Sequence, residues 1–190
     1  MDINENIKAR EELKEKSRKG QKLLIEERAW LLENPVYNEK DKLLKRDILL
    51  LPAGKKTILR ITIESVCFPG KSICPAVGSV DPKGRIQTDC ILLGRDGAPT
   101  GHTSARGLTI GADSSPAEFD FQSKNGLLSV NYECDYYDTL TKRHTGGSSA
   151  GASNAYGMKK EVLSETKVRY NCRSPIDQTF GALVFTVEWL

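Results

Sequence analysis

The sequence predicts a mainly β protein: an antiparallel β-sandwich or jelly-roll-like domain in residues 47–190, preceded by a helical segment and connector in residues 1–46. The positions of turn-forming residues support this division. All eight prolines lie at position 35 or later, and of the 16 glycines only Gly20 precedes Gly54. Regular breaks of this kind are typical of short strands. No helix is indicated between the later strands, and parallel strands need long crossovers, so we expect antiparallel pairing.

Two helices are expected before the β domain. Residues 4–19 are rich in helix formers, and Glu12 and Glu15 each precede a lysine by four residues, an order that favours ion pairs on a helix. Residues 21–33 are apolar around most of the helix, so they need cover from more than one direction. That cover could come from the β domain, the first helix or a second copy of the chain.

About nine strands are expected after the connector. Residues 56–66 alternate best, with Leu59, Ile61 and Ile63 on one face and polar residues on the other, as in a sheet with one face in water. The remaining candidates are residues 47–51, 73–80, 85–93, 107–112, 117–123, 127–136, 162–172 and 179–190.

Charge composition limits the partners. The net charge is +3, with 12 basic and 11 acidic groups in residues 1–47 and 16 and 14 in the remainder. Neither part is a polycation, so nucleic acid is an unlikely partner. No apolar stretch is long enough to span a bilayer, and the first residues do not resemble a signal peptide, so we expect a cytoplasmic protein without a membrane partner.

The cysteines and histidines do not have metal-ligand spacing. There are five cysteines without a Cys-x-x-Cys pair, and the two histidines, His102 and His144, lie in predicted loops. We therefore expect no metal, no cofactor and mostly reduced, buried thiols. Cys67 and Cys74 flank a Pro-Gly turn, and whether they form a disulfide stays open at this level.

Two neighbouring regions are candidates for ligand binding. Residues 145–157 are rich in glycine and serine and follow a basic tripeptide, which suits either an anion-binding loop or a mobile hairpin excursion, and we favour the excursion. Just upstream, carboxylates and tyrosines gather at a strand end, where they could hold Ca²⁺ or a sugar. The candidate ligand-binding residues are Asp135, Tyr137, Asp138, His144, Gly146 and Gly147.

A third pattern indicates metal-dependent hydrolysis. Glu165 and Lys167 have the Glu-x-Lys spacing of metal-dependent nucleases, with Asp138 as an upstream partner. The same alternation of charges is also typical of a solvent-facing strand, and we prefer that interpretation. No catalytic residue is assigned.

The leading hypothesis for function is a non-enzymatic assembly or partner-binding protein. Residues 1–34 would dock on a second copy or another protein, with Leu24, Trp30 and Leu31 as apolar anchors. The first alternative is a small-ligand, carbohydrate or Ca²⁺-binding β module, and the second is a metal-dependent hydrolase. The helices packing on their own β domain is a further possibility.

Overall fold

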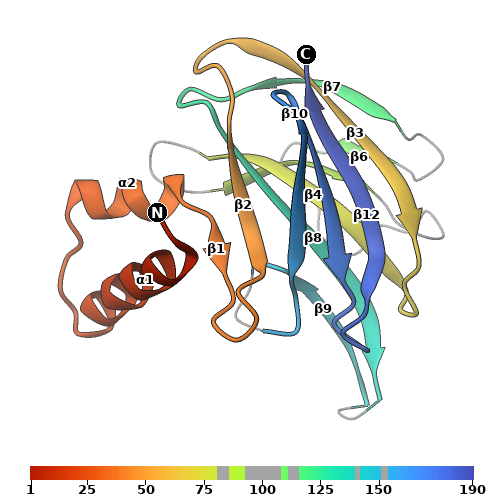
Figure 1. The fold of residues 1–190 in the computed structure, drawn as a ribbon, viewed down its shortest axis with the longest axis horizontal. Coiled ribbons are helices and arrows are strands. Elements are labelled where there is room, and N and C mark those ends of the chain that lie inside the picture. The colour runs from red at the N-terminus through yellow and green to blue at the C-terminus, as the bar shows by residue number, and fades with distance from the viewer. Residues whose placement is uncertain (81–85, 93–107, 111–115, 140–141, 151–153) are drawn as a thin grey trace.

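The chain is a mainly β protein with two N-terminal helices. The computed structural model describes residues 1–80, 86–92, 108–110, 116–139, 142–150 and 154–190 (Figure 1). In chain order the elements are α1 (Ile3–Arg18), α2 (Ile25–Glu33), β1 (Val36–Tyr37), β2 (Leu44–Leu50), β3 (Lys56–Val66), β4 (Ser72–Val80), β5 (Ile86–Leu92), β6 (Leu108–Ile110), β7 (Ala117–Gln122), β8 (Leu127–Asp138), β9 (Arg143–Ser148), β10 (Met158–Ser164), β11 (Lys167–Arg173) and β12 (Phe180–Trp189).

The strands form one continuous sheet in a nearly closed, barrel-like arrangement. Their order is β6-β5-β4-β8-β2-β10-β11-β12-β3-β7, with β1 on β2 and β9 on β8. All of these pairs are antiparallel except β5 with β6, which is parallel. The predicted mainly β chain with a helical start is confirmed, whereas the finer prediction of a sandwich or jelly roll stays a prediction.

The sheet has two parts, β6-β5-β4-β8-β2 and β10-β11-β12-β3-β7. They meet at a narrow seam between β2 and β10. Only Leu44 and Met158 are paired there, whereas β2 pairs with β8 over four consecutive residues. Side chains extend this junction: the buried Asp47 carboxylate accepts a hydrogen bond from Tyr170 Oη at 2.8 Å and pairs with Lys160 Nζ at 2.7 Å.

The alternation of β3 fixes which face of the sheet is inside. Leu59 and Ile61 are buried, as predicted, and Arg60 lies outside, where it pairs with Glu118 of β7 at 2.6 Å and Glu188 of β12 at 3.3 Å. The main core collects inward residues from both halves of the sheet. Its largest fully buried members are Tyr132, Tyr170, Phe185, Leu59, Ile61, Ile73, Leu128 and Met158.

Two predicted segments are wrong in their secondary structure. Residues 162–172 were expected as one strand, but they belong to the hairpin of β10 and β11, with Glu165 and Thr166 in the turn. The turn contains neither glycine nor proline, and Ser164 Oγ accepts the Thr166 N–H at 3.3 Å instead. Residues 145–148 were expected in a loop, but they form most of β9.

The helices pack together and lie against one side of the β domain (Figure 1). Lys16 of α1 pairs with Glu27 of α2 at 2.7 Å. Leu32 packs against Ile48 of β2 and Leu127 of β8. Leu24 is 60% exposed and Ile25 is 83% exposed. The helical segment therefore docks partly on its own β domain, and the beginning of α2 is exposed.

No helix among the described residues is long and apolar enough to cross a membrane. Cys67 is an exposed thiol, whereas Cys74, Cys134 and Cys172 are buried thiols, and no disulfide joins these four. Burial raises the pKa of the Cys134 thiol to about 12 and that of Cys172 well above its usual value. These two buried thiols are therefore protonated at neutral pH and have low reactivity.

Candidate functional site

A cleft of about 590 Å³ lies between α1 and the first two strands, and we call it the basic cleft. Five of its side chains are cationic, and two are carboxylates. Its lining residues are Ile7, Arg10, Glu11, Lys14 and Arg18 of α1; Val36, Tyr37 and Glu39 of β1 and the turn after it; Lys45 and Arg46 of β2; and Ala150 and Asn154. The cleft thus combines two parts of the chain that were predicted as separate regions.

The spacing along α1 places its charged lining on one face. Residues 7, 10, 11, 14 and 18 are three or four positions apart, so they line one side of a helix. The start of this helix is fixed by Glu5, whose Oε2 accepts the Asp2 N–H at 3.1 Å. The lining of the cleft therefore follows from ordinary helical periodicity.

Arg10 is the buried cation at the junction of the two helices. Its Nη2 donates to the carbonyls of Leu31, Asn34 and Pro35 at 3.3, 2.7 and 3.0 Å, and its guanidinium lies 5.3 Å from the centre of the Trp30 ring. These carbonyls close the end of α2, where cations are favoured. Its Nε is buried without a hydrogen-bond partner. Burial, and to a lesser degree the charge of the neighbouring Arg46, lowers the pKa of Arg10 to about 10.

Lys45 and Arg46 form the opposite wall, and neither makes an ion pair or hydrogen bond through its side chain within the described part of the chain. Lys45 is only 6% exposed, and the Nε of Arg46 is buried without a partner. Burial lowers the pKa of both groups, and Lys14 lowers that of Lys45 again. A buried cation without a counter-charge is unfavourable, because it loses hydration and gains nothing in exchange.

The two carboxylates neutralise only part of this charge. Glu11 forms an ion pair with Lys14, and this contact is the main reason that the pKa of Glu11 is lowered. Glu39 favours the charged form of Lys45, but less than burial disfavours it. Arg18 is paired outside the cleft with Glu15 at 3.5 Å. The unbalanced charge is therefore concentrated at Arg10, Lys45 and Arg46.

The remaining wall, Ala150 and Asn154, comes from within the glycine- and serine-rich segment of residues 145–157. Ser149 is buried: its Oγ donates to the Lys45 carbonyl at 2.7 Å and accepts the Tyr132 N–H at 3.1 Å. These bonds hold Ala150 beside β2. Residues 151–153 lie outside the described residues. Ser149 therefore ties this part of the segment to β2 and β8.

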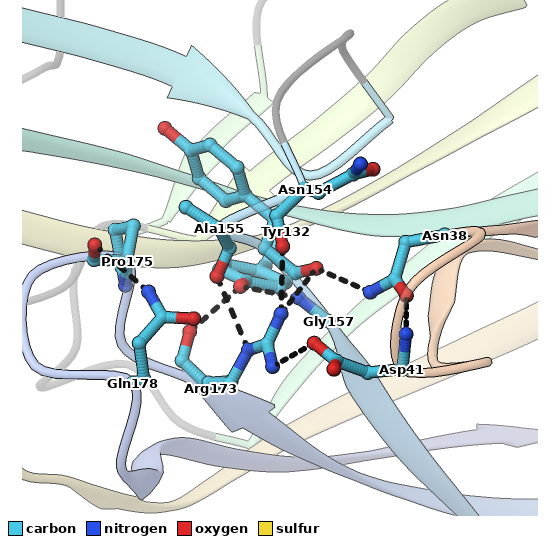
Figure 2. A network of polar contacts seen from close by, with 10 residues as sticks. Asn38, Asp41, Tyr132, Asn154, Ala155, Gly157, Arg173, Pro175 and Gln178 are labelled. Carbon is cyan, nitrogen blue, oxygen red and sulfur yellow. Dashed lines mark hydrogen bonds and ion pairs between the residues drawn. The ribbon is translucent and has the colours of Figure 1, made fainter.

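Arg173 anchors the C-terminal side of the same segment (Figure 2). Its guanidinium donates to the carbonyls of Asn154 at 2.7 Å and Ala155 at 3.2 Å, and it pairs with Asp41 at 2.6 Å. Asn38 Oδ1 accepts the Asp41 N–H at 2.7 Å. This network joins β11 and residues 154–156 to the turn between β1 and β2, which carries Glu39 into the cleft.

The six predicted ligand-binding residues lie together, but none lines the basic cleft. They belong to the β8–β9 hairpin, in which Asp135 faces Gly146 and Tyr137 faces His144. Asp135 lies 3.6 Å from Lys71 Nζ and 4.0 Å from His144 Nδ1. Within the described ranges, no group of three or more His, Cys, Asp or Glu side chains is placed to hold a metal ion.

Gly147 has a structural reason for being glycine. A Cβ atom there would lie 2.6 Å from Tyr156 Oη, too close for two non-bonded atoms. The residues of the hydrolase hypothesis do not converge. Glu165 lies exposed in the β10–β11 turn, and Lys167 pairs with Glu188 at 3.5 Å on the outer face.

The predicted partner-binding residues differ in exposure. Leu24 is exposed at the start of α2, whereas Trp30 and Leu31 are half-buried, Trp30 beneath Arg10. The basic cleft itself was not predicted from the sequence. The signal for it was a basic residue at positions 10, 14 and 18, one helical turn apart, followed by the Lys45-Arg46 pair.

Comparisons of the chain with protein families, curated proteins and solved structures found no match. Function is therefore argued from the site alone.

Proposed function

We propose that this chain is a non-enzymatic binding protein whose basic cleft takes a small ligand with a phosphate or sulfate group. The observation that carries this proposal is a pair of neighbouring cations: Lys45 is 6% exposed and has no ion pair within the described residues, and the Nε of Arg46 is buried without a hydrogen-bond partner. An anion between these side chains and Arg10 would supply the counter-charge that Glu11 and Glu39 provide only in part.

The chemistry of the lining favours an oxyanion. Arginine presents several N–H donors in a planar fork that matches phosphate or sulfate, and lysine adds a compact charge. Burial, and to a lesser degree the charge of Asp47, raises the pKa of Tyr37, so its phenol stays neutral and can donate a hydrogen bond to the ligand. The proposed binding residues are Arg10, Tyr37, Lys45 and Arg46.

The size of the cleft favours a metabolite over a bare ion. A volume of about 590 Å³ lies within the range of small-molecule pockets, roughly 300–1,000 Å³. Ile7 and Val36 give the cleft apolar lining beside the cations. A ligand with an anionic group and an organic body would therefore use more of this surface than inorganic sulfate does.

The test is calorimetric titration of the full chain with sulfate, phosphate and a panel of phosphorylated metabolites, at constant ionic strength in chloride. We expect saturable binding that Lys45→Met and Arg46→Met each weaken at least about tenfold, the loss of one charge-assisted contact. Lys124→Met is the matched control, because Lys124 is exposed and lies outside the cleft. No saturable binding of any probe, or equal weakening by the control, contradicts the proposal.

A second candidate is self-association through the start of α2. The observation that favours it is the exposure of two large apolar side chains, Leu24 at 60% and Ile25 at 83%. Exposed apolar anchors of this kind are common at interfaces. Light scattering of the full chain and of a Leu24→Ser, Ile25→Ser double variant tests this. A dimer that the double variant dissociates supports assembly, and a monomer in both cases counts against it.

A further inference from the structure

We propose that the anion in the basic cleft is also the clamp that fixes the helical segment, residues 1–34, against the β domain. This inference rests on the proposed function. In it, the docked position of the helices depends on the ligand, so that binding of a small anion controls the exposure of a protein surface.

The first support is that the two walls of the cleft belong to different parts of the chain. Arg10 and Lys14 come from α1, whereas Lys45 and Arg46 come from β2. The two walls repel each other: the charge of Arg46 lowers the pKa of Arg10, and the charge of Lys14 lowers that of Lys45. An anion between the walls would attract the cations of α1 on one side and those of β2 on the other, and so would offset their mutual repulsion.

The second support is the weakness of the direct attachment. Within the described residues, no ion pair joins residues 1–34 to the rest of the chain. The ion pairs of the segment are internal, such as Lys16 with Glu27, and Arg10 donates only to carbonyls at the end of α2 and at Pro35.

What holds the helices to the β domain is mainly apolar. Leu32 packs against Ile48 and Leu127, and the Glu39 carboxyl lies near enough to Glu11 to make a minor contribution to its lowered pKa. A contact between two acids is weak at neutral pH, because both groups favour the charged form in water. The Leu32 packing is thus one direct tie, a short contact of α1 with β1 is another, and residues 34–35 are the covalent connection.

The clamp follows from linkage. A ligand that contacts both walls binds the docked form more tightly than a form in which the walls have separated, so it shifts the equilibrium towards docking. At a free ligand concentration of about ten times its Kd, the docked form gains a factor on the order of ten. The coupling is reciprocal, so anything that holds the helices down also tightens anion binding.

The test is hydrogen exchange of the full chain by mass spectrometry, with sulfate at about ten times its calorimetric Kd and with chloride at the same ionic strength. We expect amides of α1 and α2 to exchange on the order of tenfold more slowly in sulfate, with β3 and β12 unchanged as an internal control. In Arg46→Met, which removes the repulsion of Arg10 and weakens anion binding, we expect slower exchange than in the wild type in chloride and a smaller further slowing in sulfate. Lys124→Met should behave as the wild type does.

The outcomes separate this inference from the proposed function. Calorimetric binding of sulfate with no change in exchange of α1 or α2 overturns the clamp and leaves the binding site intact. Slowing of α1, α2, β3 and β12 alike also overturns it, because the ligand then stabilises the whole fold. Absence of any binding overturns both.

Discussion

Asp47 and Lys45 are two residues apart on β2, and both are buried. Within the described residues the charge of Asp47 is paired, whereas that of Lys45 is not. Asp47 points into the sheet, where Lys160 and Tyr170 satisfy it at 2.7 and 2.8 Å. Lys45 faces the basic cleft without a partner among the described residues. Buried charges are generally paired, because an unpaired one is costly. The contrast is that the charge inside the sheet is paired by the chain itself, whereas the charge in the cleft is the one for which we propose a ligand.

The largest expected loss of stability is at another buried charge that is paired, Arg173, which pairs with Asp41. Arg173→Met removes the donor to Asp41 and to the Asn154 carbonyl, so we expect the free energy of unfolding to fall by about 3 kcal/mol. Urea denaturation measures it. Arg143→Met, at an exposed position of β9, should change stability little. Equal losses in the two variants would show that the buried network contributes nothing specific.

A smaller loss is expected at the seam. Tyr170→Phe removes the hydrogen bond to the Asp47 carboxylate and leaves the ring packed on Phe185, 5.1 Å away. A hydrogen bond to a charged group contributes about 2 kcal/mol, so the urea midpoint should fall accordingly. Tyr137→Phe is the matched control, because Tyr137 is 50% exposed. A Tyr170→Phe variant as stable as the wild type would contradict the assigned role of this bond.

For the unpaired charges of the cleft we expect no loss of stability on substitution, in contrast to the paired charges. Lys45→Met and Arg46→Met keep the apolar stem and remove a buried, unbalanced charge, so in chloride buffer each should leave stability unchanged or raise it by about 1 kcal/mol. The same variants should lose sulfate binding. A drop in stability as large as that of Arg173→Met would mean that these charges are structural after all.

The smallest effect is a pH dependence at the alkaline end. Burial lowers the pKa of Lys45 below its usual value and that of Arg10 to about 10, so both begin to lose charge at a lower pH than in an unfolded chain. Sulfate affinity should therefore be constant near neutral pH and fall as the pH rises towards 10. Calorimetry on the wild type and Lys45→Met checks this, because the decline should be shallower in the variant.

The lowered pKa of Arg10 also determines how its contribution to the free energy of unfolding changes with pH. The folded chain binds fewer protons than the unfolded chain between about pH 10 and the usual pKa of arginine, so the contribution of Arg10 to stability rises with pH there. Below that range the unfavourable burial of its charge is fully present. An anion relieves it, so a stabilising effect of sulfate that persisted after Arg10 lost its charge would contradict this account.

How far the sequence predicts this fold depends on local signals. Residues 56–66 were placed correctly because strict alternation there coincides with a buried inner face and a charged outer face. The β10–β11 hairpin was missed because the turn at Glu165 carries the same charged pattern as its strands. Glycines at 146 and 147 indicated a loop, although β9 tolerates them as an edge partner of β8.

The candidate site was harder to predict for a different reason. Arg10, Lys14 and Arg18 alternate with Glu11 and Glu15, and such a mixture in sequence is typical of an exposed helix with ion pairs. Which cations stay unpaired depends on how α1 and β2 are placed on the two walls of the cleft, and this is set only by the tertiary fold. The charges counted along the chain therefore balance, although the folded chain gathers more cations than carboxylates in the basic cleft.

The seam between β2 and β10 gives the β domain a line of mechanical weakness. Backbone pairing there is limited to Leu44 and Met158, and side chains around Asp47 bridge the strands beyond it. Between β2 and β10 themselves the backbone contributes a single residue pair, whereas β3 and β12 are joined along seven residue pairs. The sheet should therefore unroll at this line first, on the strand that also carries Lys45 and Arg46.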